Sequence, residues 1–317
     1  MLAHASNARP VRRVLVHGLV YFGEVFADFM SGDGWEFQYF PDQGLGNLAA
    51  MTNALRNCDL VYQIGGRVTI GKFLTATRLL GRHRIVMHWV GSDTLDQRPD
   101  ADNGKTDSWI RKGIHHWADS EWIRGEVSSL GISSELVPLP SPRVPENPLP
   151  LPSEFCVLVY VPSVERSELY GLDSILEVAK RLPQIRFELV GLRDGPIPNE
   201  IAPNLRSHRR MPHLDEFYRR ASVVWRPARH DGLSWMVLES LGYGRHVLWT
   251  YAFPGCIQST SVSEAAAHLL RLYNLHQGRG LQIKTEGISF MANSEYSPKS
   301  FKPRILSRLE EIIASSC

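Results

Sequence analysis

The sequence has few cysteines, no long apolar run and almost no net charge. Its cysteines, Cys58, Cys156, Cys256 and Cys317, lie far apart with no CxxC pair, so neither a disulfide framework nor a zinc site is expected. No run of about 18 apolar residues occurs, which argues against a membrane-spanning helix. The N-terminal segment lacks the apolar core of a signal peptide, and we therefore expect a cytoplasmic protein.

A strong charge of one sign is also missing. The chain has 35 Lys and Arg against 33 Asp and Glu, a formal net charge of +2, and no basic stripe. This balance gives no indication of nucleic-acid binding. Hydrophobic residues make up 43% of the 317 residues, which is enough to form packed cores and suits two domains of about 150 residues each.

The chain instead shows a regular alternation of short apolar strands and helices. The run RRVLVHG (12–18) precedes a helical pattern, and this cycle recurs to about residue 137 and again from about residue 155. Alternation of this kind predicts an α/β fold with open parallel sheets covered by helices on both faces.

A proline-rich segment divides the two series of cycles. Seven of the twenty prolines lie between Pro138 and Pro152, which predicts a stiff linker; one surface loop within a single domain is the alternative. We predict an N-terminal domain at 1–140, the linker at 141–153, a C-terminal domain at 154–300 and a last helix at 301–317, which can pack on either domain. Two doubly wound sheets would face a cleft where ligands bind at the strands' carboxyl ends.

The stretch DGLSWMVLESLGYG (231–244) places a carboxylate, Glu239, inside an apolar helical run. A buried carboxylate is costly unless it is paired or binds a ligand. Ser234 can cap the helix, and Gly232 permits a close approach of backbone to a ligand. The amides of the first turn then form an anion site suited to a diphosphate, and both Asp231 and Glu239 can reach one ligand.

These residues resemble the E-x7-E signature of the retaining, family 4 glycosyltransferases with the GT-B fold. Here the signature is written Asp231, seven residues, Glu239, followed by SLGYGRHVLWT. The segments at 116–140 and 171–191 also look like family segments. The resemblance implies two Rossmann-like domains, with Glu239 holding the ribose hydroxyls of a nucleotide and Asp231 beside the donor sugar. The amides of Gly232 and Leu233 would meet the diphosphate, with Ser234 next to them.

The resemblance further implies the reaction. A sugar would pass from a nucleotide-diphosphate sugar to a glycan, glycolipid or small-molecule acceptor, with retention of configuration and with no metal or other cofactor. Asp231 is one methylene shorter than the family's Glu, and Tyr170 stands where the family has a Lys. Arg166, Arg226 and Arg229 are the candidates for binding the donor phosphates, because arginine binds phosphate in a bidentate manner. A solvated or internally paired arginine is the alternative for each.

The loops of the N-terminal domain are expected on the acceptor side. Gly18, Gly65 and Gly66 allow a close approach of backbone to a ligand, or simply form turns. His88 is a candidate catalytic residue that can contact the donor or acceptor; a structural role is the alternative. Asp93 can orient an acceptor hydroxyl; a helix-cap or turn role is the alternative.

Two further features concern metals and membranes. Asp100 and Asp102 form an Asp-x-Asp pair that we interpret as chance, so no metal site is predicted. Trp109, Trp117 and Trp122 can seat a lipid-linked acceptor in peripheral contact with the inner membrane face, or pack in the core. The sequence does not predict an oligomeric state.

Three functions fit these observations. A retaining glycosyltransferase is favoured by the spacing of Asp231 and Glu239. A sugar-nucleotide epimerase on the same fold fits the carboxylates less well. A non-catalytic partner of an active transferase is suggested by the departures at Asp231 and Tyr170.

Overall fold

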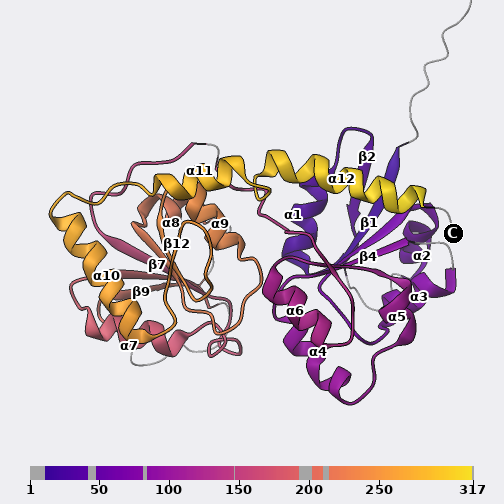
Figure 1. Cartoon of the computed structure of the whole chain (residues 1–317), viewed down its shortest axis with the longest axis horizontal. Coiled ribbons are helices and arrows are strands. Elements are labelled where there is room, and N and C mark those ends of the chain that lie inside the picture. The colour runs from indigo at the N-terminus through magenta and orange to yellow at the C-terminus, as the bar shows by residue number, and fades with distance from the viewer. Residues whose placement is uncertain are drawn as a thin grey trace, which may run out of the picture. The chain divides into compact units, whose positions relative to one another are not determined.

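The computed structural model of the chain describes residues 11–41, 48–80, 84–145, 147–192, 202–209 and 214–315. The chain divides into two compact units (Figure 1). The first unit contains Met1–Pro142 and Lys299–Cys317, and the second contains Arg143–Pro298.

The first unit is built on a six-stranded parallel sheet with the strand order β2-β1-β3-β4-β5-β6. The strands are β1 (Arg12–Gly18), β2 (Trp35–Tyr39), β3 (Leu60–Ile64), β4 (Arg84–Trp89), β5 (His115–Ala118) and β6 (Glu135–Leu136). The helices are α1 (Val20–Met30), α2 (Leu48–Asn57), α3 (Lys72–Leu80), α4 (Asp93–Asp102), α5 (Ser108–Gly113), α6 (Glu121–Ser129) and α12 (Pro298–Ala314). Strand β3 is buried along its whole length, because helices cover both faces of a parallel sheet.

The last helix, α12, packs on the first unit. The ring of Phe301 lies 6.4 Å from that of Phe26, and the Lys302 ammonium donates hydrogen bonds to the carbonyls of Phe29 and Ser31. Figure 1 shows this helix, in yellow, beside α1. The packing answers the question left open by the sequence, which did not decide between the two domains.

The second unit has a six-stranded parallel sheet with the strand order β12-β11-β10-β7-β8-β9. The strands are β7 (Cys156–Val161), β8 (Arg186–Gly191), β9 (Leu205–His208), β10 (Val223–Arg226), β11 (His246–Trp249) and β12 (Cys256–Gln258). The helices are α7 (Leu172–Arg181), α8 (Asp215–Arg220), α9 (Trp235–Gly242), α10 (Val262–Gln277) and α11 (Thr285–Asn293).

Helices cover both faces of this second sheet. Ile175 of α7 and Leu269 of α10 pack against one face, together with Val157 of β7. Phe217 of α8 and Met236 of α9 pack against the other face with Leu158, the next residue of β7. Neighbouring strand residues point to opposite faces, so both layers draw on the same apolar runs. The predicted α/β class, with two doubly wound parallel sheets, is confirmed.

The proline-rich segment between β6 and β7 has no helix or strand among its described residues. Its end is held by the second unit: Arg245 donates to the Pro150 carbonyl at 2.9 Å, and His276 contacts the Pro152 carbonyl at 2.9 Å. Within the part of the chain that the structure describes, no helix has the length and apolar character needed to cross a membrane.

Candidate functional site

The loop from Pro227 to Ser234 joins the carboxyl end of β10 to helix α9. Every residue of α9 is buried, including Glu239. Ser234 occupies the N-cap position with an extended backbone, and its carbonyl accepts hydrogen bonds from Val237 and Leu238. Its hydroxyl makes no capping hydrogen bond, so no Ser234 side chain competes with a ligand for the first-turn amides.

Glu239 is the fifth residue of α9 and is 5% exposed. The Tyr218 hydroxyl, on helix α8, donates a hydrogen bond to Glu239 Oε2 at 2.7 Å. The Tyr218 ring stacks on Tyr243 with their centroids 5.2 Å apart, which fixes its orientation. The buried carboxylate thus has a neutral protein donor. The sequence did not predict this contact and favoured a ligand as the partner of Glu239.

Asp231 and Arg226 form a buried ion pair. Arg226 Nε lies 2.7 Å from Asp231 Oδ2, and Arg226 Nη2 lies 2.9 Å from Asp231 Oδ1. Both side chains are less than one-tenth exposed. Burial by itself would lower the pKa of Arg226, but the Asp231 carboxylate raises it above its usual value. Arg226 therefore stays protonated beside this carboxylate.

Two tyrosines enclose the Arg226 guanidinium. Its central carbon lies 4.8 Å from the ring of Tyr170 and 5.4 Å from the ring of Tyr160. The two rings meet edge to face with their centroids 5.9 Å apart. Burial raises the pKa of the Tyr170 hydroxyl, while the charge of Arg226 acts in the opposite direction. Tyr170 is therefore a neutral wall of the site.

The other two candidate arginines differ from Arg226. Arg229 is about half exposed, and its guanidinium is paired with Glu168 at 2.6 Å and with Asp173 at 2.7 Å. Arg166 is half-buried in the turn before α7, where its amide donates to the Ser163 hydroxyl. Gly232 and Leu233 are buried in the loop before α9. The structure thus places Arg226 at the end of β10, Asp231, Gly232, Leu233 and Ser234 in the loop that follows it, and Glu239 in the helix after that loop.

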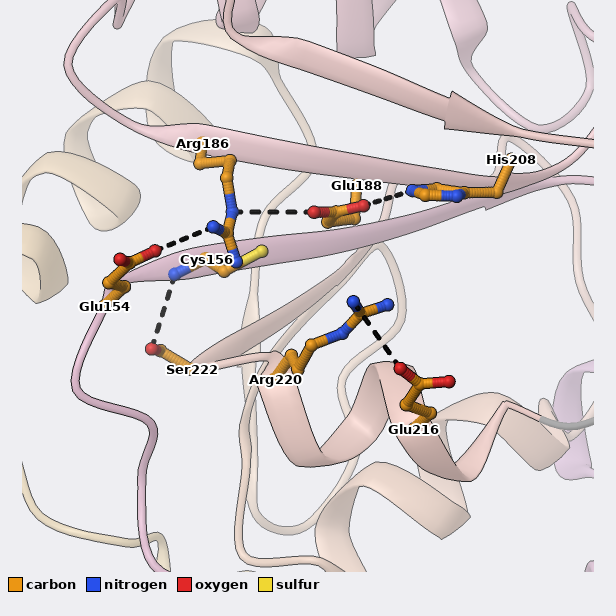
Figure 2. Close-up of polar contacts among 8 residues, drawn as sticks. All are labelled: Glu154, Cys156, Arg186, Glu188, His208, Glu216, Arg220 and Ser222. Carbon is orange, nitrogen blue, oxygen red and sulfur yellow. Dashed lines mark hydrogen bonds and ion pairs between the residues drawn. The ribbon is translucent and has the colours of Figure 1, made fainter.

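A second cluster of polar side chains lies where β7 and β8 begin, as Figure 2 shows. Its members are Glu154, Cys156, Arg186, Glu188, His208, Glu216, Arg220 and Ser222. The buried Glu188 carboxylate contacts His208 Nε2 and lies 3.5 Å from Arg186 Nε. Burial raises the pKa of the Cys156 thiol to about 11, although Arg186 lowers it. This cluster links three strands through mutual contacts and keeps its thiol unreactive.

The predicted glycines of the first unit meet steric requirements of the fold. A Cβ on Gly18, whose φ is +112°, would lie 1.9 Å from the Ile64 carbonyl oxygen. A Cβ on Gly66 would lie 1.9 Å from the Trp89 ring. Gly65 has a φ of +100°, which disfavours side chains. Packing and backbone conformation therefore explain these three residues without a ligand.

Asp93 is the first residue of α4 and ties two loops together. Its carboxylate accepts hydrogen bonds from the amide of Gly66 at 2.5 Å and from that of Val90 at 3.2 Å. Burial raises the pKa of Asp93 to about 7, against the lowering effect of these amides. Of the structural alternatives considered from the sequence, the turn role describes these loop contacts better than a helix cap.

His88 does not have the geometry of a catalytic residue. It is fully buried, with Nδ1 2.7 Å from the Tyr62 hydroxyl and Nε2 2.8 Å from the Val137 carbonyl. A carbonyl only accepts, so Nε2 carries the proton and Nδ1 accepts from Tyr62. Burial lowers the pKa of His88 to about 3. Both ring nitrogens are used inside the protein, and the catalytic prediction for His88 is not supported.

The other residues singled out from the sequence also have structural contacts. Trp117 is buried, while Trp109 and Trp122 pack against the same apolar core, so core packing describes all three. Asp100 lies 3.0 Å from the Lys105 ammonium. Among the residues that the structure describes, no group of three His, Cys, Asp or Glu side chains is arranged to hold a metal ion.

Comparison of structures, and not of sequences, found proteins similar to this chain. No family model matches the sequence, and no curated protein matches it. A glycosyltransferase from Rickettsia africae is similar over 96% of this chain and 100% of its own, with 9% identity and a TM-score of 0.65. A sucrose-phosphate synthase from Thermosynechococcus elongatus is similar over 96% and 100%, with 11% identity and a TM-score of 0.70.

A third similar structure contains a nucleotide. The pneumococcal O-GlcNAc transferase GtfA, in complex with UDP and GlcNAc, matches 84% of this chain and 60% of its own, with 13% identity and a TM-score of 0.57. The chain has the GT-B fold. At these identities the likeness concerns the fold, so the activity has to be argued from the residues of the GT-B site.

Proposed function

We propose that this GT-B protein transfers a sugar from a nucleotide-diphosphate donor to a glycan, lipid-linked or small-molecule acceptor. The observation that carries the proposal is the pair Asp231 and Glu239, buried at the carboxyl end of β10 and at the start of α9. Ligands of doubly wound sheets bind at this end of the strands. A buried carboxylate with a neutral partner suits a ligand rich in hydroxyls.

In this proposal each group has a defined task. Glu239 accepts hydrogen bonds from the ribose hydroxyls, and the amides from Gly232 to Ser234 face the diphosphate. Departure of the nucleotide leaves an oxocarbenium-like sugar and increases the negative charge on the phosphates. The N-terminal dipole of α9 stabilises that charge without a metal. Asp231 lies at the donor sugar, and we propose retention of anomeric configuration.

A non-catalytic role is the second candidate, and one observation favours it. Both oxygens of Asp231 are engaged by Arg226, so the carboxylate assigned to the donor sugar is already bound within the protein. A protein of this kind would bind a partner transferase and turn over no donor.

Binding of nucleotides to the full chain separates these candidates. We expect one of UDP, GDP or ADP to raise the thermal midpoint, because a ligand at 100 times its Kd stabilises the folded state by about 2.7 kcal/mol. The matching sugar conjugate should then be consumed in the presence of excess chelator. Folded protein that binds none of them would sink the transferase proposal. Turnover that needs an added divalent ion would contradict metal independence.

A further inference from the structure

We propose that Arg226 is the cation that binds the donor diphosphate and that Asp231 occupies it until the donor arrives. The inference rests on the proposed function and adds a regulatory step to the same site. Donor binding would exchange one anion for another at Arg226 and release Asp231 toward the sugar.

The geometry of the ion pair supports an exchange of the carboxylate for a phosphate. Asp231 takes two nitrogens of Arg226, Nε and Nη2, at 2.7 and 2.9 Å through its two oxygens. Two oxygens of a phosphate group bind a guanidinium in the same bidentate manner. A phosphate can therefore replace the carboxylate without a change in the position of the arginine.

Residues other than Asp231 also hold Arg226 in place. The rings of Tyr160 and Tyr170 lie 5.4 and 4.8 Å from its guanidinium carbon, and they contact each other edge to face. Its backbone carbonyl, within β10, accepts a long hydrogen bond of 3.5 Å from Thr250. The guanidinium thus keeps its place if Asp231 turns away.

The surroundings of Arg226 favour an incoming anion. Arg226 ends β10, and α9 begins nine residues later with no hydroxyl cap from Ser234. Helix α7 begins after Gly171, where a Cβ would lie 2.5 Å from the carbonyl oxygen of Pro227. Two helix N-termini therefore approach the loop that follows Arg226, and each favours negative charge.

The backbone contact of Asp231 is independent of the ion pair. Its backbone amide donates to the Tyr251 hydroxyl at 3.2 Å, a contact that does not involve the carboxylate. The carboxylate leaves Arg226 when the diphosphate takes its place, and it becomes available to a sugar hydroxyl. The donor thereby creates the site for its own sugar.

Titration calorimetry with a nucleoside, its monophosphate and its diphosphate tests this exchange. The base is the one found in the nucleotide screen. We expect Asp231→Asn to tighten diphosphate binding about tenfold and to leave nucleoside binding unchanged, because the competing anion is gone. Arg226→Gln should lose most of the preference for the diphosphate over the nucleoside.

The double variant Arg226→Gln/Asp231→Asn places two neutral amides at the pair, and it serves if Arg226→Gln alone fails to fold. It too should lose the affinity gained from the phosphates. Arg181→Gln, which removes an exposed arginine paired with Glu177, is the matched control and should bind like the wild type.

The outcomes separate the two proposals. If the wild type binds a diphosphate and Asp231→Asn binds it no more tightly, the exchange is wrong and the transferase proposal stands. The same holds if the arginine variants keep their preference for phosphate. If no variant binds any nucleotide, both proposals fail.

Discussion

The second unit carries two sets of buried charges on one sheet. At the carboxyl end of β10, Arg226 and Asp231 form a buried pair beside the start of α9, with Glu239 one turn inside that helix. At the amino ends of β7 and β8, Glu188 and Arg186 belong to the larger cluster of Figure 2. Burial and charge alone do not distinguish the two sets.

Their surroundings do distinguish them. The cluster around Glu188 extends from buried Glu188 through Arg186 to exposed Glu154, so its charges are balanced by neighbours that reach water. The charges around Arg226 lie next to helix N-termini at the ligand-binding end of the strands. Under the proposed function, the first set stabilises the sheet and the second is arranged for a ligand.

The largest expected effect is that of Glu239→Ala on nucleotide affinity. Loss of the carboxylate that accepts the ribose hydroxyls should weaken binding about 100-fold, or about 2.7 kcal/mol. Calorimetry with the diphosphate found in the nucleotide screen measures this affinity, and circular dichroism checks that the variant folds. Unchanged affinity in a folded variant would remove the main support for the transferase proposal.

Glu188→Ala should show the opposite pattern. We expect a loss of about 2 kcal/mol in the free energy of unfolding, because Arg186 and His208 lose the buried carboxylate that they contact. Nucleotide affinity should match the wild type, since Glu188 contacts Arg186 and His208 rather than the loop before α9. Urea titration and calorimetry on the same sample give both quantities. A variant of normal stability and weakened nucleotide binding would reverse our assignment of the two sets.

His88→Ala extends the comparison to the first unit. The Tyr62 hydroxyl and the Val137 carbonyl would lose their buried partner, at a cost of about 2 kcal/mol in unfolding free energy. Because the pKa of His88 is near 3, the ring is neutral at physiological pH and supplies no titration near pH 6.5. The folded variant should keep the turnover and the pH profile of the wild type. Loss of one limb of that profile would restore the catalytic hypothesis for His88.

The smallest effect concerns Asp93. Its pKa of about 7 exceeds the ordinary value of 3.8, so between these pH values the folded state keeps a proton that the unfolded chain has lost. Its contribution to stability is therefore full below about pH 4 and declines as the pH rises to about 7. Asp93→Asn should remove this decline, on the order of 1 kcal/mol after allowance for partial exposure. Urea titrations at several pH values measure the free energy of unfolding of both proteins. An equal decline of this free energy with pH in the two would contradict the prediction.

The sequence predicted the fold better than the site. Apolar strands alternating with helices determine a doubly wound sheet almost directly, because each strand must be covered on both faces. The position of Glu239 in α9 followed from helical spacing. The contact with Tyr218 did not, because its partner lies 21 residues away on another helix.

The pairing of Arg226 with Asp231 was also out of reach. The two lie five positions apart, and no regular spacing brings such residues together; the bend of the loop does so. The same limit applies to His88, since a histidine in a strand shows its burial only after the sheet has formed. In both cases tertiary contacts decide which groups remain available to a ligand.

The packing of α12 gives the chain an order of assembly. The first unit consists of a long N-terminal segment and a final helix, and the second unit lies wholly between them in the sequence. During synthesis the second unit is complete before the ribosome has made the helix that covers Phe26. The second unit is thus able to mature first, while the first unit waits with part of its core uncovered. A fragment ending at Pro298 should fold in its second half and expose apolar surface in its first.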